Sequence, residues 1–172
     1  ESRSVVEKST EITPASGTYS TKVTFDANAE DCDFGVKSGP VANQRKMFDA
    51  YTTGEHQGQS PAFLQFWVYL ASNMPEDFAV YIMSGAEEAP DTLSLPLAEY
   101  VDSTKIGQWQ QIVIPLTEMK EQGTVTAAGT YNYDSVAGVG FTGKNTTDVP
   151  ITFYLDNVRF VTRADEPEFI EP

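Results

Sequence analysis

The sequence predicts an all-β fold, an antiparallel β-sandwich with jelly-roll topology. Short runs in which apolar and polar residues alternate recur at regular spacing along the 172 residues, and turn-forming residues separate them. The best helical candidate is the segment 116–122, with at most two turns. Many short strands with scarcely any helix are typical of sandwiches and jelly rolls. A chain of this length suits one domain that buries roughly 70% of its unfolded surface.

The first half of the chain is expected to begin with two strands, one near Val5 and one over 19–25. An acidic loop over 28–33 and an ambiguous segment over 34–47 follow them. The strongest strand of the chain is AFLQFWVYLA at 62–71, because its apolar and polar side chains alternate and aromatic residues are frequent in it.

The strand at 62–71 is expected to form a hairpin with a strand at 78–83 across a short turn. The even-numbered residues of both segments are apolar, so we expect them to share the core. That register places Tyr69 opposite Tyr81 on the outer face, with Trp67 beside them.

The second half of the chain is expected to contain more strands and one short helix. The final strand, ITFYLDNVRF, alternates until Asp156 and Asn157 interrupt it, and such residues in a strand usually have a task. The expected order is a loop over 84–96, a strand or short helical turn over 96–100, a strand from Trp109, a helix over 116–122, a loop over 123–133, and strands over 135–142 and 151–160.

The charge of the chain restricts its partners. Lys and Arg number 11 and Asp and Glu number 25, which gives a net charge of −14. Nucleic acids and anionic membranes bind largely through cationic side chains, so we expect neither as a partner. No apolar run approaches the roughly 18 residues of a membrane helix. The charge is compatible with neutral polymers and with divalent cations.

The catalytic motifs in the chain are weak. GVGFTG at 138–143 fits a dinucleotide-binding pattern, but a strand rather than the required helix follows, so these glycines are better explained by a strand. Cys32 and His56 are the only residues for thiol–imidazole chemistry, and a zinc site rich in Cys or His is excluded by their number. Paired carboxylates of the glycosidase type remain open. Asn145 begins a glycosylation sequon.

Three motifs resemble carbohydrate-binding modules with a galactose-binding-like jelly roll. They are the final strand with its Asp156-Asn157 pair, the strand WQQIVIPL at 109–116, and the early strand SGTYSTKV at 16–23. Their order and spacing frame nearly the whole chain. The resemblance implies that Trp109 fills the core at the start of its strand.

The resemblance also implies a structural calcium ion on Asp156. Calcium takes six to eight oxygen ligands, and in these modules the others come from the N-terminal segment. We expect Glu7 and the region of Asp26 to supply them here, although the apolar-Glu-x-Gly segment that usually begins these modules is missing. The alternative is that Asp156 caps a β-bulge.

Aromatic side chains form the main candidate binding site. An outward-facing Trp67 and Tyr69 beside Tyr81 would offer rings on which the C–H faces of sugars stack, with Gln65 bonding the hydroxyls. The alternative is that a loop covers these rings. Loop tyrosines would wall the cleft. The predicted ligand-binding residues are Gln65, Trp67, Tyr69, Tyr81, Tyr51, Tyr131 and Tyr133.

The sequence therefore predicts a non-catalytic module over residues 1–163, followed by a linker or tail over 164–172. We expect it to bind a plant cell-wall polysaccharide of the β-glucan, cellulose or xyloglucan type and to target an appended enzyme. The expected context is a monomeric module of a larger secreted or cell-surface protein, such as a cellulosomal enzyme. The alternatives are a small jelly-roll glycoside hydrolase or lyase, and a structural or adhesive domain without a sugar site.

Overall fold

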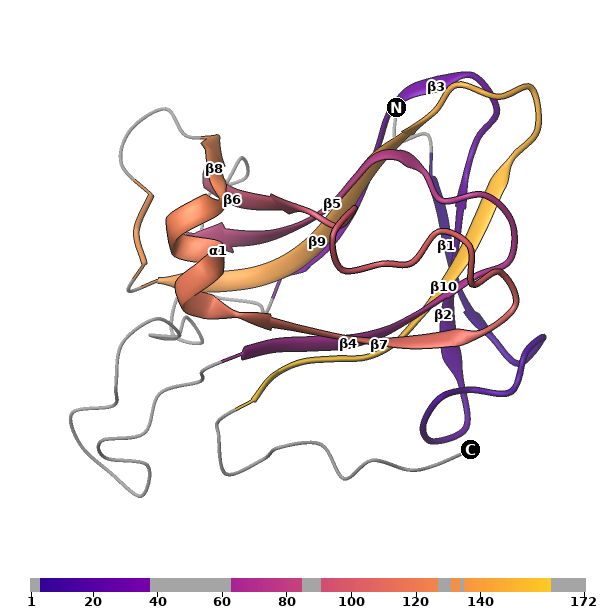
Figure 1. The fold of residues 1–172 in the computed structure, drawn as a ribbon, viewed down its shortest axis with the longest axis horizontal. Coiled ribbons are helices and arrows are strands. Elements are labelled where there is room, and N and C mark those ends of the chain that lie inside the picture. Colours follow the sequence, from indigo (N-terminus) through magenta and orange to yellow (C-terminus); the bar gives the residue numbers. More distant parts are fainter. Residues whose placement is uncertain (1–3, 38–62, 85–90, 127–130, 134, 162–172) are drawn as a thin grey trace.

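The computed structural model describes residues 4–37, 63–84, 91–126, 131–133 and 135–161, which form a two-layered β-sandwich (Figure 1). One layer, sheet A, contains five strands in the order β1-β2-β10-β4-β7. In chain order these strands are β1 (Ser4–Ser9), β2 (Ser20–Phe25), β4 (Phe63–Leu70), β7 (Trp109–Pro115) and β10 (Ile151–Val161).

The second layer, sheet B, contains five strands in the order β3-β9-β5-β6-β8. All strand pairings within the two sheets are antiparallel, so the predicted antiparallel sandwich is confirmed. The strands are β3 (Ala29–Lys37), β5 (Glu76–Ser84), β6 (Asp91–Pro96), β8 (Thr124–Thr126) and β9 (Val136–Asn145).

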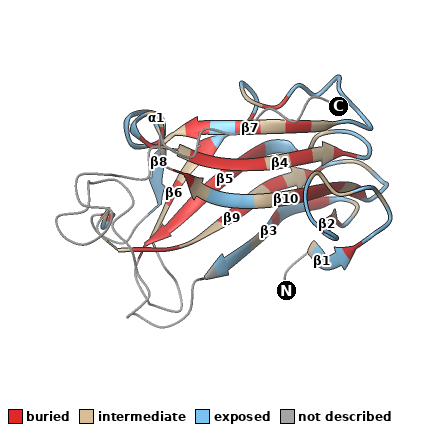
Figure 2. Ribbon diagram, turned by 90° about the horizontal axis from the view of Figure 1, so that it is seen from below, coloured by how far each residue is buried: buried red, intermediate tan, exposed pale blue. Residues whose placement is uncertain are grey.

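The core lies between the sheets, where the apolar residues that alternate along each strand meet (Figure 2). Phe66 of sheet A packs edge-on against Phe141 of sheet B, with ring centroids 5.1 Å apart. Phe25 and Phe153 pack in the same way at 5.2 Å. Each fully buried ring contributes roughly 1.5–3 kcal/mol of transfer free energy. This core fixes which side chains are left on the two outer faces.

The single helix among the described residues, α1 (Leu116–Gln122), has the bounds that the sequence predicts. It buries Leu116 and Met119. Within the described part of the chain, no helix is long and apolar enough to cross a membrane.

The predicted hairpin between 62–71 and 78–83 is wrong. β4 pairs with β10 and β7, whereas β5 pairs with β6 and β9 in the other sheet. The even-numbered apolar residues do share the core, but they approach it from opposite layers. The chain crosses between the layers after β4, so Tyr81 lies far from Tyr69, on the opposite outer face.

Three segments that we expected to be loops contain strands. β3 begins at Ala29, and its register against β9 shifts between Ala29 and Cys32. That irregularity breaks the period of two, which is why the apolar pattern was not visible in the sequence. β6 lies within the expected loop over 84–96, and the short β8 lies within the expected loop over 123–133.

Candidate functional site

The outer face of sheet A carries part of the predicted aromatic site. Residues 65, 67 and 69 of β4 point away from the core, because Leu64, Phe66, Val68 and Leu70 are fully buried between the sheets. Tyr69 pairs with Trp109 on β7 and with Tyr154 on β10. Both rings contact that of Tyr69 edge-on, at centroid distances of 5.5 Å and 5.8 Å respectively. The prediction that Trp109 fills the core is therefore wrong, because Trp109 lies on this outer face.

A segment between β1 and β2, residues 11–16, is tied to this aromatic cluster, and we call it the strap. The indole Nε1 of Trp109 donates a hydrogen bond to the carbonyl of Thr13 at 2.8 Å. The hydroxyl of Tyr154 donates to Glu11 at 2.9 Å. Desolvation and this bond raise the pKa of Tyr154, while hydrogen bonds from Lys22 and Tyr154 lower the pKa of Glu11. Two of the three rings in this cluster are therefore hydrogen-bonded to the strap, while the alternative in which a loop covers the rings stays a prediction.

The other end of this face is also not an open platform. Gln65 is 1% exposed, and its Oε1 accepts no hydrogen bond from the described part of the chain. Trp67, which pairs with Gln111 on β7 and Asp156 on β10, is half-buried. An amide as deeply buried as that of Gln65 does not reach a ligand at the surface. Among the described residues, the predicted contacts left on this face are Trp67 and Tyr69, which are both half-buried.

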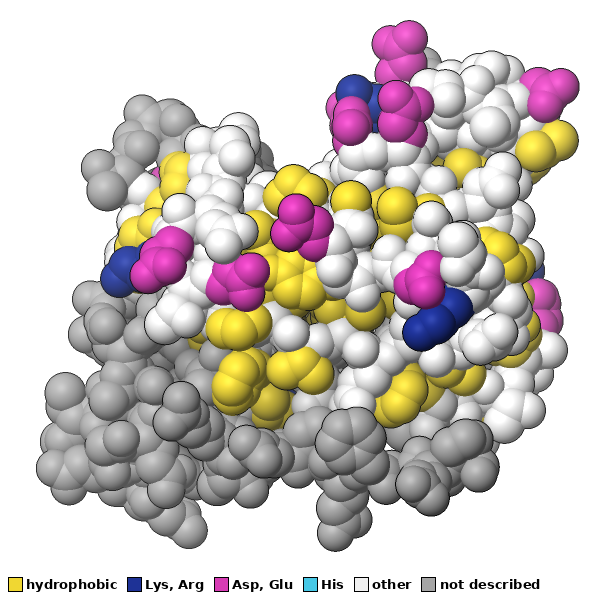
Figure 3. Space-filling view, in the orientation of Figure 1, with side chains coloured by type: hydrophobic (Ala, Val, Ile, Leu, Met, Phe, Trp, Pro, Cys, Tyr) yellow, Lys and Arg dark blue, Asp and Glu magenta, His cyan; other side chains and the backbone are white. Residues whose placement is uncertain are grey.

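The outer face of sheet B has a different character. In Figure 1, β5 and β9 bend upward, so that the side of their sheet turned away from sheet A is concave. The upper outline of the molecule in Figure 3 dips accordingly between the end near β8 and the end near β3. Hydroxyl-bearing side chains lie on this concave face. Ser94 of β6 pairs with Tyr81 of β5, and Thr124 of β8 pairs with Ser94, so the three side chains share one face.

Tyr81 lies flat on this concave face. It pairs with Gly140 of β9, and Gly140 pairs with Gly35 of β3. A Cβ placed at Gly140 would collide with the ring carbons of Tyr81, and one placed at Gly35 would contact its hydroxyl. The side chain therefore extends across β9 to β3, which is possible because neither position has a side chain.

The phenol of Tyr81 ends near an acid. Its hydroxyl oxygen lies 3.5 Å from Oδ2 of Asp33 on β3. Burial, with Asp33 nearby, raises the pKa of Tyr81 to about 12, so the phenol stays protonated at neutral pH. Tyr81 is 9% exposed, so only a small part of this side chain is open to solvent on the concave face.

Of the loop tyrosines predicted to bind a ligand, the two that the structure describes pack in or against the core. Tyr131 is buried, and its hydroxyl donates a hydrogen bond to the carbonyl of Ile82 at 3.2 Å. Its ring contacts that of Tyr133 at 4.8 Å, and Lys120 lies 4.7 Å from the Tyr133 centroid. Tyr131 thus belongs to the core cluster. Tyr51 lies outside the described residues, as does His56.

The residues predicted to bind calcium do not converge. Both carboxylate oxygens of Asp156 accept hydrogen bonds from Ser16, and Glu7 forms an ion pair with Lys22 at 3.3 Å. Asp26 follows β2 at the opposite end of its ladder with β10. Within the described part of the chain, no group of three or more His, Cys, Asp or Glu side chains could hold a metal ion. Calcium binding stays a prediction, but these three residues do not fit one ion.

The glycine-rich segment and the sequon have structural explanations. GVGFTG lies inside β9 and is followed by a turn and β10, as the strand interpretation requires. Asn145 is 1% exposed, and its Nδ2 donates hydrogen bonds to the carbonyls of Phe25, Asp26 and Val149. In the folded domain, the nitrogen that glycosylation requires is therefore occupied.

The comparisons with known proteins agree with this architecture. A family 30 carbohydrate-binding module of a cellulosomal cellulase from Clostridium thermocellum superposes with a TM-score of 0.66 at 14% identity, over 94% of this chain and 83% of that chain. A β-1,2-glucanase from Parabacteroides distasonis gives 0.62 at 17% identity, over 93% of this chain and 22% of that chain. A family 11 carbohydrate-binding module from Clostridium thermocellum, in complex with a β-1,3-1,4-mixed-linked tetrasaccharide, gives 0.52 at 10% identity, over 92% and 82%.

At these identities the structural likeness concerns the fold alone. A search of curated proteins finds no match. The sequence itself matches the family model described as carbohydrate binding domain 30 over residues 58–162, which is more than half of the chain. The chain therefore belongs to the carbohydrate binding domain 30 family.

Proposed function

We propose that this domain is a non-catalytic module that binds a neutral β-glucan on the concave outer face of sheet B. The observation that carries the proposal is the Tyr81 side chain, which extends over Gly140 toward Gly35 on that face. An aromatic ring in a shallow depression suits the C–H face of a pyranose. Placed polar groups beside an apolar floor are typical of small-ligand sites. Ser94 and Thr124 lie in the same row and can bond sugar hydroxyls.

The choice of a neutral glycan rests on charge and on the structural neighbours. A net charge of −14 opposes the approach of anionic polymers such as pectin. One structural neighbour is a family 30 module of a cellulosomal cellulase, and another was solved with a mixed-linked β-glucan tetrasaccharide. These neighbours support a β-glucan as the ligand and a secreted, multidomain enzyme as the context. Tethering such an enzyme to its polysaccharide raises the local substrate concentration.

The binding role is favoured over a glycosidase role. A glycosidase needs a carboxylic acid whose pKa is raised, so that it can donate a proton. A hydrogen bond from Lys22 lowers the pKa of Glu11, and hydrogen bonds from Thr104 lower the pKa of Asp102. Both shifts run in the direction opposite to the one that a general acid requires, so neither of these two carboxyls suits that role. The match to a carbohydrate-binding family model favours the binding role.

Affinity electrophoresis in gels that contain a polysaccharide tests this function. We expect mixed-linkage β-glucan, hydroxyethylcellulose or xyloglucan to retard the domain, and polygalacturonate to leave its mobility unchanged. The same preparations should release no reducing sugar and no unsaturated product. Retardation by the anionic polymer alone would contradict the proposed ligand. Sustained sugar release that a single carboxylate substitution abolishes would contradict the non-catalytic role.

A further inference from the structure

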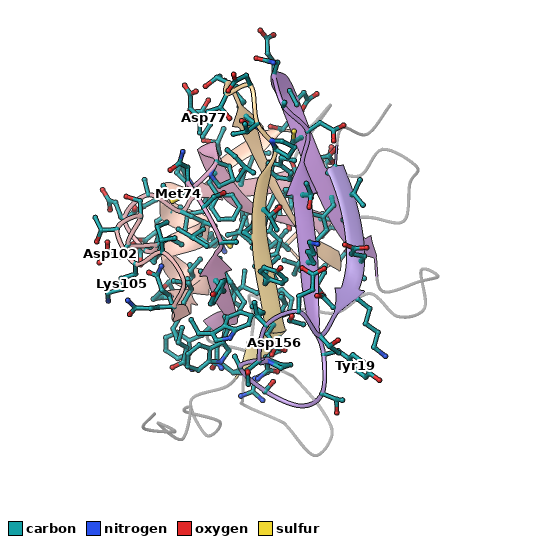
Figure 4. All side chains as sticks on the ribbon, turned by 90° about the vertical axis from the view of Figure 1, so that its right-hand side faces the viewer. Tyr19, Met74, Asp77, Asp102, Lys105 and Asp156 are labelled. Atoms are coloured by element: carbon teal, nitrogen blue, oxygen red, sulfur yellow. The ribbon has the colours of Figure 1, made fainter. Side chains whose placement is uncertain are left out.

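Asp156 lies where β10 departs from regular pairing. The register of β10 against β4 shifts between Asp156 and Arg159, and Asn157 adopts a left-handed conformation with φ of 50°. Asn tolerates this region better than most residues, which explains why a strand accepts the Asp-Asn pair. The bulge presents the Asp156 carboxylate toward the connection between β1 and β2, as the labelled side chain in Figure 4 shows.

The carboxylate of Asp156 is already bonded to the strap. The backbone N–H of Ser16 donates to Oδ2 at 2.8 Å, and the Ser16 hydroxyl lies 3.4 Å from Oδ1. Both oxygens that a cation would use therefore have protein donors. A calcium ion at this place would have to compete with a charge-assisted hydrogen bond, which is among the stronger kinds.

Asp26, another predicted ligand, cannot join Asp156 around one ion. Leu155 pairs with Thr21 and Ile151 with Phe25, so Asp156 and Asp26 flank opposite ends of this ladder. At about 3.3 Å per residue their backbones are separated by roughly 20 Å, whereas calcium holds its oxygens at 2.3–2.6 Å.

A lysine supplies positive charge beside the strap. The ammonium of Lys22 lies 2.8 Å from Glu11 and 3.3 Å from Glu7. Glu11 also accepts a hydrogen bond from the hydroxyl of Tyr154. Glu7 and Glu11 are thus both paired with a cation that the protein itself supplies.

The strap joins the N-terminal hairpin to two strands of sheet A. It reaches β10 through Tyr154 and Asp156, and β7 through Trp109. In the carbohydrate-binding modules that the sequence resembles, a structural calcium ion often links the N-terminal segment to the final strand. We propose that in this chain the strap, residues 11–16, takes the place of that structural calcium ion.

Thermal unfolding of the domain with EDTA or with millimolar calcium tests the proposal. A ligand that binds the native state raises the melting temperature by mass action, so calcium should leave the wild-type melting temperature unchanged. Asp156→Ala removes the acceptor for Ser16. It should lower the melting temperature by about 2–4 °C, a shift typical of one lost interaction in a chain of this length, with and without calcium.

Asp156→Asn is the matched control, because its amide oxygen still accepts the Ser16 N–H while the negative charge is gone. We expect it to melt between the wild type and Asp156→Ala, and to be equally indifferent to calcium. A calcium-dependent rise in the wild type that Asp156→Asn abolishes would show a cation site and overturn the proposal. So would an Asp156→Ala variant that melts at the wild-type temperature, since the strap would then stabilise nothing through Asp156.

Discussion

Replacing Tyr81 by alanine is expected to weaken glucan binding about tenfold or more. Stacking of a ring on an aromatic side chain contributes roughly 1–3 kcal/mol where it has been measured for nucleic-acid bases, and 1.4 kcal/mol corresponds to a factor of ten. Isothermal titration calorimetry with a soluble β-glucan oligosaccharide measures the effect.

Tyr81→Phe is the matched control, because it keeps the ring over Gly140 and loses only the hydroxyl near Asp33. It should bind within a few-fold of the wild type. Trp67→Ala, on the opposite sheet, should leave the affinity unchanged. A tenfold loss in Trp67→Ala with normal binding by Tyr81→Ala would place the site on sheet A, where the sequence alone had put it.

Tyr81 is mostly buried, so its removal also affects packing. Gly140→Val separates the two effects, because the new side chain displaces the ring of Tyr81 without removing it. We expect weakened binding in this variant as well. A folded Gly140→Val domain with wild-type affinity would show that the flat orientation of the ring is not required.

Replacing Asn145 by alanine is expected to reduce the free energy of unfolding by about 2–4 kcal/mol, because it leaves several buried polar groups without partners. Its Nδ2 donates to three carbonyls, those of Phe25, Asp26 and Val149. Its Oδ1 accepts from the backbone N–H of Thr147 at 3.0 Å and from its hydroxyl at 2.7 Å. Urea denaturation at neutral pH measures the loss.

Thr146→Ala is the control for Asn145, since the Thr146 hydroxyl bonds Glu76 on the exposed surface. Surface bonds of this kind contribute little, and the variant should stay within about 0.5 kcal/mol of the wild type. If Asn145→Ala were as stable as Thr146→Ala, the turn between β9 and β10 would not depend on this network.

The strongest local patterns in the sequence predicted the corresponding elements correctly. The helix over 116–122 and the strands over 62–71 and 151–160 were found because each has a clear apolar period, which the last strand keeps until Asp156. The core face of β4 was also correct, since alternation decides which side chains share a face. Alternation does not decide which strand lies alongside, and for that reason the pairing of β4 with β5 was wrong.

The candidate site depends on contacts between distant parts of the chain. Tyr81 lies flat because Gly35 and Gly140 come next to it from two other strands, and no local pattern reveals this. Trp109 was assigned to the core by resemblance, whereas its contact with Thr13 of the strap requires knowledge of a loop 96 residues away.

The most direct test of the proposed site is a titration of the isotopically labelled domain with a cello-oligosaccharide, followed by amide chemical shifts in NMR spectra. We expect the shifts to cluster on β3, β9, β5 and β6 around Gly35, Gly140 and Tyr81, while β4, β7 and β10 stay largely unchanged. Shifts that cluster around Trp67 and Tyr69, with the amides around Tyr81 unaffected, would contradict the concave face of sheet B as the binding site.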